Sequence, residues 1–135
     1  ANTNLAGWSV VLYNGNGGAS YATIALSGTI TNQQNGMGCR AFAASGLQNG
    51  SPDGVALVDP NGAVVEFLSY EGAMTATNGP ATGRQSVAIA VSEDDTTPAG
   101  YSLQRQGTGH AGPAFTWSGP LPMTLGTINA GQILQ

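Results

Sequence analysis

Residues 53–70, D-G-V-A-L-V-D-P-N-G-A-V-V-E-F-L-S-Y, constrain the fold more than any other part of the chain. Two apolar runs flank the tetrapeptide Asp59-Pro60-Asn61-Gly62. In such a turn Asp accepts local backbone hydrogen bonds, Pro fixes φ, and Asn and Gly tolerate positive φ. We therefore predict a β-hairpin and an antiparallel β class. A period of two groups Val55 with Leu57 on the first strand, and Val65 with Phe67 on the second.

Strand-sized apolar segments separated by Gly, Asn and Pro recur along the whole chain, whereas helical periodicity is weak. This spacing is typical of an all-β sandwich or barrel. No internal repeat or change of composition marks a boundary, so we expect one domain over residues 1–135. The other expected strands are Trp8–Tyr13, Tyr21–Leu26, a short one at Arg40–Ala43, Ser86–Val91, Tyr101–Gln106 and Phe115–Trp117, followed by a Pro-containing tail.

The apolar positions of these segments predict the core, and residues 71–84, rich in Gly, Ala, Thr and Pro, predict an extended surface loop. In the segment Ser86–Val91 the alternation turns Val87, Ile89 and Val91 inward. The predicted core comprises Trp8, Val10, Leu12, Ile24, Leu26, Val55, Leu57, Val65, Phe67, Ile89, Val91, Leu103 and Trp117.

Charged residues make up 7% of the chain, against about 25% in ordinary soluble domains. There is no lysine, and solubility must come from Asn, Gln, Ser, Thr and exposed backbone. This composition is common among secreted β-proteins and predicts an extracellular or cell-surface location. The start A-N-T-N-L is not a signal peptide, so a mature or excised segment is expected.

A net charge of −4 with three scattered arginines disfavours a direct nucleic-acid ligand, because binding a polyanion requires a basic stripe. No segment is long and apolar enough to insert into a bilayer. The single cysteine, Cys39, excludes an internal disulfide. We expect Cys39 to be a buried small hydrophobe at the start of a strand; the alternative is an intermolecular disulfide.

No arrangement of residues predicts catalysis, so we expect a non-enzyme. His110 is the only histidine, lies in the loop sequence G-T-G-H-A-G-P, and has no G-x-S-x-G partner motif, which predicts a solvated loop residue. With one histidine and one cysteine, zinc is excluded. Glu66 and Glu71 match a glycosidase pair by residue type alone, and the strand position of Glu66 favours a solvent-facing residue.

The turn Glu93-Asp94-Asp95, with Asp53, Asp59, Glu66 and Glu71 as further oxygen donors, is a weak calcium candidate. No D-x-[DN]-x-[DN]-G loop is present, and adjacent carboxylates in a turn are usually solvated, so no cofactor is expected. The aromatic residues lie within strand patterns, where core packing is the first expectation and a sugar-stacking platform the alternative.

Six motifs occur in order along the chain: L-A-G-W-S-V-V-L-Y-N-G (Leu5–Gly15), N-G-S-P-D-G-V-A-L-V-D (Asn49–Asp59), V-V-E-F-L-S-Y-E-G (Val64–Gly72), S-L-Q-R-Q-G-T-G (Ser102–Gly109), F-T-W (Phe115–Trp117) and T-L-G-T-I-N-A-G-Q (Thr124–Gln132). Together they resemble the lamin tail domain family, and more closely its bacterial secreted branch. This resemblance covers almost the whole chain. It implies an immunoglobulin-like β-sandwich and a non-catalytic module that accompanies secreted or surface-anchored proteins.

The chain departs from the family at its start, because members begin with another apolar strand and only four residues precede Leu5. That strand is either absent from this chain or supplied by another one. A sheet lacking an edge strand is a template for strand addition. We therefore expect pairing with a protein partner, or self-association, by strand addition.

The predicted function is binding or assembly through sheet edges and polar loops, notably Thr31–Gly38 and Gly72–Gly83. Three alternatives remain open: an accessory domain of a secreted nuclease or phosphatase, a structural subunit of an extracellular polymer assembled by strand complementation, and a carbohydrate-binding module. The sequence does not distinguish among them.

Overall fold

The computed structural model describes all residues, 1–135, and contains eight strands and one short 3-10 helix. The all-β class is confirmed, with the strands divided between two sheets. No helix is long and apolar enough to cross a membrane. Contacts divide the chain into two compact units: unit 1 comprises Ala1–Asn4, Thr29–Ala41 and Ala90–Gln135, and unit 2 comprises Leu5–Gly28 and Phe42–Ile89.

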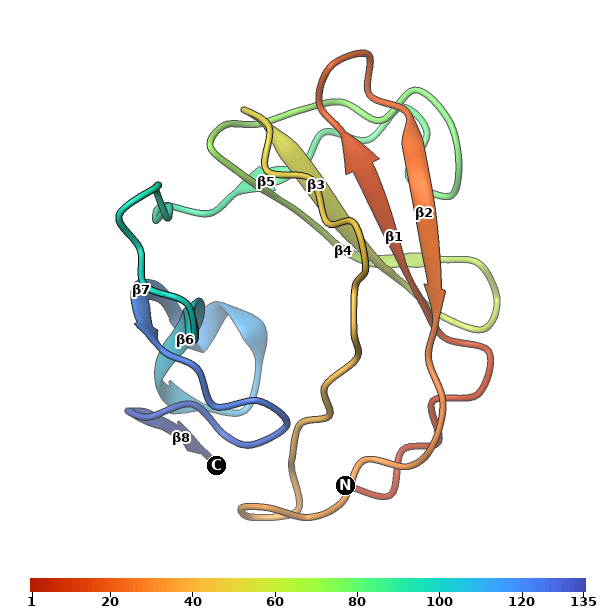
Figure 1. The fold of residues 1–135 in the computed structure, drawn as a ribbon. Helices are drawn as coiled ribbons and strands as arrows, with labels where there is room; N and C mark the ends of the chain where they lie inside the picture. Colours follow the sequence, from red (N-terminus) through yellow and green to blue (C-terminus); the bar gives the residue numbers. More distant parts are fainter. The chain divides into compact units, whose positions relative to one another are not determined.

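Unit 2 contains a five-stranded sheet in the order β2-β1-β3-β4-β5 (Figure 1). Neighbouring strands are antiparallel except β4 and β5, which run parallel. The expected strand at Ser86–Val91 is reduced to two residues, and Val87 is exposed rather than inward. The bounds are β1 Ser9–Asn14, β2 Ser20–Ala25, β3 Asp53–Val58, β4 Val64–Tyr70 and β5 Val87–Ala88.

The predicted hairpin is confirmed as β3 and β4. Its turn closes as the sequence indicates: the Asp59 carboxylate accepts the N–H groups of Asn61 at 2.9 Å and Ala63 at 2.8 Å. Gly62 adopts a φ of 82°, a conformation that residues with a Cβ rarely adopt. Local turn chemistry therefore determines where the two strands end.

The predicted inward faces of this hairpin were wrong in part. Val65 is 58% exposed, and Ala56 and Val58 are buried on β3 in place of Val55 and Leu57. On β3 the alternation holds, but the buried side is that of Ala56 and Val58. On β4 the cause is a bulge: Leu57 pairs with Glu66 but Val58 pairs with Val64, which leaves Val65 as an extra residue turned to solvent. Simple alternation fails at such an insertion.

The core of unit 2 lies between one face of the sheet and the segment 71–86. The sheet contributes Val11, Tyr13, Ala56, Val58, Val64 and Phe67. The expected extended loop at residues 71–84 is present and mostly exposed, but its residues Met74, Ala76 and Ala81 are buried against the sheet. Of the other predicted core residues, Leu12 and Leu26 are buried, whereas Trp8, Val10, Ile24, Val55, Leu57, Ile89, Val91, Leu103 and Trp117 are half-buried.

Unit 1 contains a three-stranded sheet in the order β7-β6-β8 (Figure 1). The long strand β6, Tyr101–Gly109, extends the predicted one, and a 3-10 turn η1, Gly112–Ala114, leads into β7, Thr116–Pro122. The expected tail instead contains a further strand, β8, Gln132–Leu134, which runs parallel to β6. The expected strand at Arg40–Ala43 was wrong, because this stretch has no strand structure.

Candidate binding pocket

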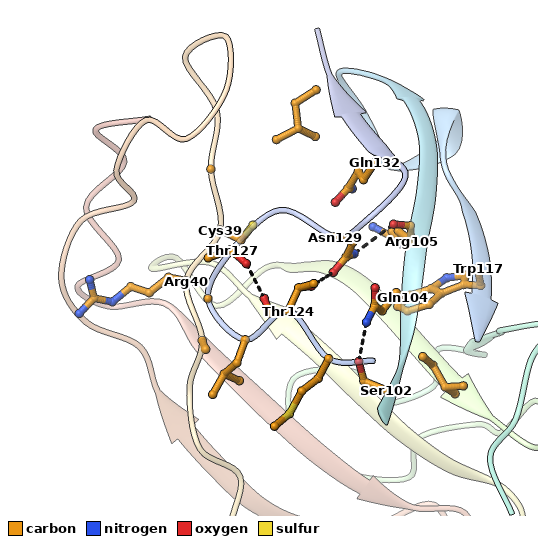
Figure 2. Close-up of a pocket in the computed structure, with 17 residues that line it drawn as sticks. Cys39, Arg40, Ser102, Gln104, Arg105, Trp117, Thr124, Thr127, Asn129 and Gln132 are labelled. Carbon is orange, nitrogen blue, oxygen red and sulfur yellow. Dashed lines mark hydrogen bonds between the residues drawn. The ribbon is translucent and has the colours of Figure 1, made fainter. Parts of the chain in front are cut away.

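A pocket of about 480 Å³ lies within unit 1 (Figure 2). Strand β6 forms one wall with Ser102 and Gln104, and the segment 123–129 forms another with Met123, Leu125 and Asn129. A volume of this size is within the range of small-ligand sites, which span roughly 300–1,000 Å³.

Gln104 supplies the most unusual group in the pocket wall. Its side chain is 3% exposed, and its amide nitrogen donates to Ser102 Oγ at 3.0 Å and to the Pro122 carbonyl at 2.8 Å. Because the Pro122 carbonyl can only accept, it fixes which end of the amide is nitrogen. The amide oxygen is buried and has no hydrogen-bond partner. In Figure 2 this oxygen lies on the side of the amide away from Ser102.

The opposite wall is held by hydrogen bonds among its own residues. Thr124 Oγ1 donates to Asn129 Oδ1 at 2.8 Å, and Asn129 Nδ2 donates to the Arg105 carbonyl at 3.0 Å. Thr127 Oγ1 donates to the Thr124 carbonyl at 3.0 Å. Asn129 therefore uses both ends of its amide, and the segment 123–129 is tied to β6 before any ligand arrives.

The rest of the lining combines apolar side chains with Arg40, Arg105 and Gln132 and contains no carboxylate. Leu125 is 74% exposed and Met123 is also exposed, so apolar surface remains available at the rim. The Arg105 guanidinium carbon lies 4.9 Å from the centroid of the Trp117 ring, a cation–π arrangement. Arg40 lines the pocket through its stem, and Figure 2 shows its head directed away from the other labelled side chains.

Cys39 lies in this wall, as a free cysteine in an irregular segment rather than at the start of a strand. Its Sγ donates to Gln33 Oε1 at 3.3 Å. Burial raises the pKa of the Cys39 thiol, because desolvation disfavours the thiolate. The group is half-buried, and a protonated thiol is a weak nucleophile.

The calcium candidates Glu93, Asp94 and Asp95 are exposed in a turn of unit 1. Asp94 Oδ1 accepts the Thr96 hydroxyl at 2.6 Å and the Thr96 N–H at 2.8 Å, and these bonds lower the pKa of Asp94. The chain contains no group of three or more His, Cys, Asp or Glu side chains that could hold a metal ion. The Asp94 carboxylate is thus hydrogen-bonded within its own turn.

The remaining sequence candidates are not gathered in the pocket. His110 is exposed at the bend after β6, as expected for a solvated loop residue. Asp53 is buried in unit 2, where its carboxylate accepts the N–H groups of Gly15, at 3.0 Å, and Gly50. Glu66 is half-buried on β4, and Glu71 follows that strand with a φ of 59°.

Sequence reasoning missed Gln104, Thr124 and Asn129, which define the pocket. A signal for Gln104 does exist, because Ser102, Gln104 and Gln106 place three polar side chains at alternate positions of a strand. Thr124 and Asn129 have no such signal, since the bond from Asn129 to the Arg105 carbonyl forms only when the tail folds back onto β6.

Comparisons with known proteins provide no identification: no family model matches the chain, and neither the curated proteins nor the solved structures contain a match. The resemblance to lamin tail domains therefore rests on the sequence motifs alone. The class that the fold and pocket define is an all-β protein with a small-ligand-sized pocket in one unit and an open-edged sheet in the other.

Proposed function

We propose that this protein is a non-catalytic binding or assembly module that pairs with a partner strand along β2. Strand β2 forms one edge of the five-stranded sheet and has β1 as its only neighbour. An edge strand presents unpaired N–H and C=O groups, which favour the addition of another strand. The alternation of hydrogen bonds along β2 is the observation that supports the proposal.

That alternation identifies the residues that face outward. The N–H of Leu26 donates to the Trp8 carbonyl at 2.9 Å, and the register then pairs Val10 with Ile24 in the same bonded manner. The intervening residues Thr23 and Ala25 therefore direct their backbone groups away from β1. Both are exposed. About three residues of open edge are available there.

The other end of β2 is already covered. The Ser20 N–H donates to Asn78 Oδ1 at 2.7 Å, and Thr77 donates its backbone N–H to the Gly18 carbonyl at 2.8 Å. A partner strand would therefore pair with residues 23–25 of β2. Main-chain pairing of this kind provides affinity without requiring charge, which suits a chain with 7% charged residues.

The class of partner follows from the charge and the motifs. A net charge of −4 disfavours nucleic acid, so we propose a protein strand, from a partner or from a second copy. The low charge and the resemblance to secreted lamin tail domains support an extracellular or cell-surface location and an immunoglobulin-like arrangement.

The test is the variant Thr23→Pro, which removes an outward N–H, compared with Thr23→Val, which retains it. Sedimentation velocity between about 5 and 500 µM should show concentration-dependent association for the parent chain and for Thr23→Val, with association at least tenfold weaker for Thr23→Pro. Circular dichroism checks that both variants remain folded. Equal association of the two variants would contradict the proposal. The proposal would also be contradicted if the parent chain stayed monomeric at every concentration and bound no strand-forming peptide from a displayed library.

A further inference from the structure

We propose a second binding site, the pocket of unit 1, for a neutral peptide-like ligand: an apolar side chain carried next to an amide N–H, with that N–H donated to the Gln104 amide oxygen. This site is separate from the β2 edge, since every residue that lines it belongs to unit 1. Two observations support this site: the cavity itself, and the buried Gln104 amide oxygen in its wall, which has no donor.

The hydrogen bonds already made within the pocket wall define which polar group the ligand must have. The Gln104 nitrogen is already used by Ser102 and the Pro122 carbonyl, and the orientation of the amide is fixed by the latter. A buried acceptor without a donor costs about 1–3 kcal/mol. The amide oxygen of Gln104 therefore favours a ligand that supplies an N–H or O–H group.

The charge of the lining selects a neutral donor. The lining contains Arg40 and Arg105 but no carboxylate, so an ammonium group would have no countercharge. The Arg105 guanidinium lies over the Trp117 ring, and the Arg40 head is directed away from the other labelled side chains. An anion would bring its own acceptors against the Gln104 oxygen. A neutral amide satisfies that oxygen without either cost.

The apolar part of the lining favours a peptide over a sugar. Trp117 carries the Arg105 guanidinium over its ring, and the exposed rim side chains, Met123 and Leu125, are aliphatic or a thioether. Sugars require a flat aromatic face and several polar partners. Asn129 and Thr124 are hydrogen-bonded to each other. The Gln104 oxygen beside apolar surface matches an amide next to a branched apolar side chain.

The experiment titrates the full chain with N-acetyl-leucinamide and follows the Gln104 side-chain amide and the Met123 and Leu125 methyl groups by NMR. Controls are the fully N-methylated analogue, which keeps the apolar side chain but has no N–H, and methyl glucoside, which offers hydroxyl donors. Saturable shifts at these groups are expected for the leucinamide, with affinity at least tenfold weaker for both controls.

Three variants test the location of the site. Leu125→Asp, at an exposed position of the rim, should weaken binding at least tenfold, whereas Leu47→Asp, at an exposed leucine of unit 2, should leave it unchanged. Gln104→Leu should also weaken binding, with the NMR spectrum reporting whether it is folded. Four outcomes would each overturn the proposal. The first two are the absence of saturable shifts and equal binding of the N-methylated analogue. The others are tighter binding of the glucoside and equal effects of Leu125→Asp and Leu47→Asp. Thr23→Pro should bind the amide normally, so failure of one proposal is distinguishable from failure of the other.

Discussion

The phenolic oxygen of Tyr13 accepts the backbone N–H of Ala81 at 3.0 Å, joining residues that are 68 positions apart. Tyr13 is fully buried, and its ring packs at a tilt against Phe67 with a centroid separation of 5.2 Å. The hydroxyl therefore satisfies a backbone group inside the core while the ring fills it. This bond fastens the segment 71–86 to the sheet.

Tyr13→Phe should lower the free energy of unfolding by about 1–3 kcal/mol, because it leaves the buried N–H of Ala81 without a partner. The matched variant is Tyr21→Phe, which removes a hydroxyl that accepts the Gln48 N–H at an exposed site. Water can replace that acceptor, so the loss should be below about 1 kcal/mol. Urea denaturation measures both. Losses of equal size would show that burial of the Ala81 N–H does not matter.

Gly15→Ala should destabilise the chain strongly, because an added Cβ would lie 1.8 Å from the Pro52 carbonyl oxygen. The backbone must move to relieve this contact, which also disturbs the hydrogen bond from Gly15 to the buried Asp53. A loss of at least about 2 kcal/mol is expected. Gly17→Ala meets no atom within 4 Å but has a φ of +89°, so its cost should be about 1 kcal/mol, from backbone strain alone. Thermal melts of the two variants should rank in this order, and the reverse ranking would contradict the close approach.

Ser69 and Ser86 form a buried pair of hydroxyl groups 2.6 Å apart, and Ser86 Oγ also accepts the Met74 N–H at 2.9 Å. Ser86→Ala should cost about 1–3 kcal/mol because it leaves that N–H without a partner. Ser69→Ala should cost less. In a double-mutant cycle the pair should show a coupling of at least about 0.5 kcal/mol, and additive losses would show that the two hydroxyls act independently.

The stability of the chain should fall as the pH rises above the ordinary pKa of cysteine, 9.0. Burial raises the pKa of the Cys39 thiol in the folded chain. Below pH 9.0 the thiol is therefore protonated in both the folded and the unfolded chain, and its ionisation does not lower the free energy of unfolding. At higher pH the unfolded thiol ionises first, and the free energy of unfolding decreases until the folded pKa is passed. Because the group is half-buried, the loss should stay below about 1 kcal/mol. Denaturation midpoints under reducing conditions at about pH 8 and pH 10 measure this loss, and Cys39→Ala should reduce it.

Features with local causes could be predicted from the sequence. The hairpin is one example, since Asp59 and Gly62 determine the turn within five residues. The bulge at Val65 could not be predicted, because it depends on which residue of β3 lies opposite each residue of β4. The covering role of Met74 and Ala81 was hidden for a related reason: a segment rich in Gly, Thr and Pro has the composition of a surface loop even where it is anchored to a tyrosine hydroxyl.

The pocket was less predictable than the fold. Leu103 and Trp117 belong to recognisable strand patterns, but the acceptor that distinguishes the site is a glutamine, a residue type with no specific motif. Strand β8 and the segment before it follow Pro120 and Pro122, which indicated a tail. Their pairing with β6 comes from contacts across some 25 residues, such as that between Gln106 and Ala130.

The two units are interleaved along the chain, which crosses from one to the other four times, after residues 4, 28, 41 and 89. Neither can be obtained by cutting out one continuous stretch. During synthesis the five-stranded sheet has all of its strands once residue 89 has left the ribosome, whereas the pocket also requires residues up to Leu134. A ribosome stalled just after residue 89 has emerged should therefore carry a nascent chain with its buried tyrosine core formed and its pocket not yet formed.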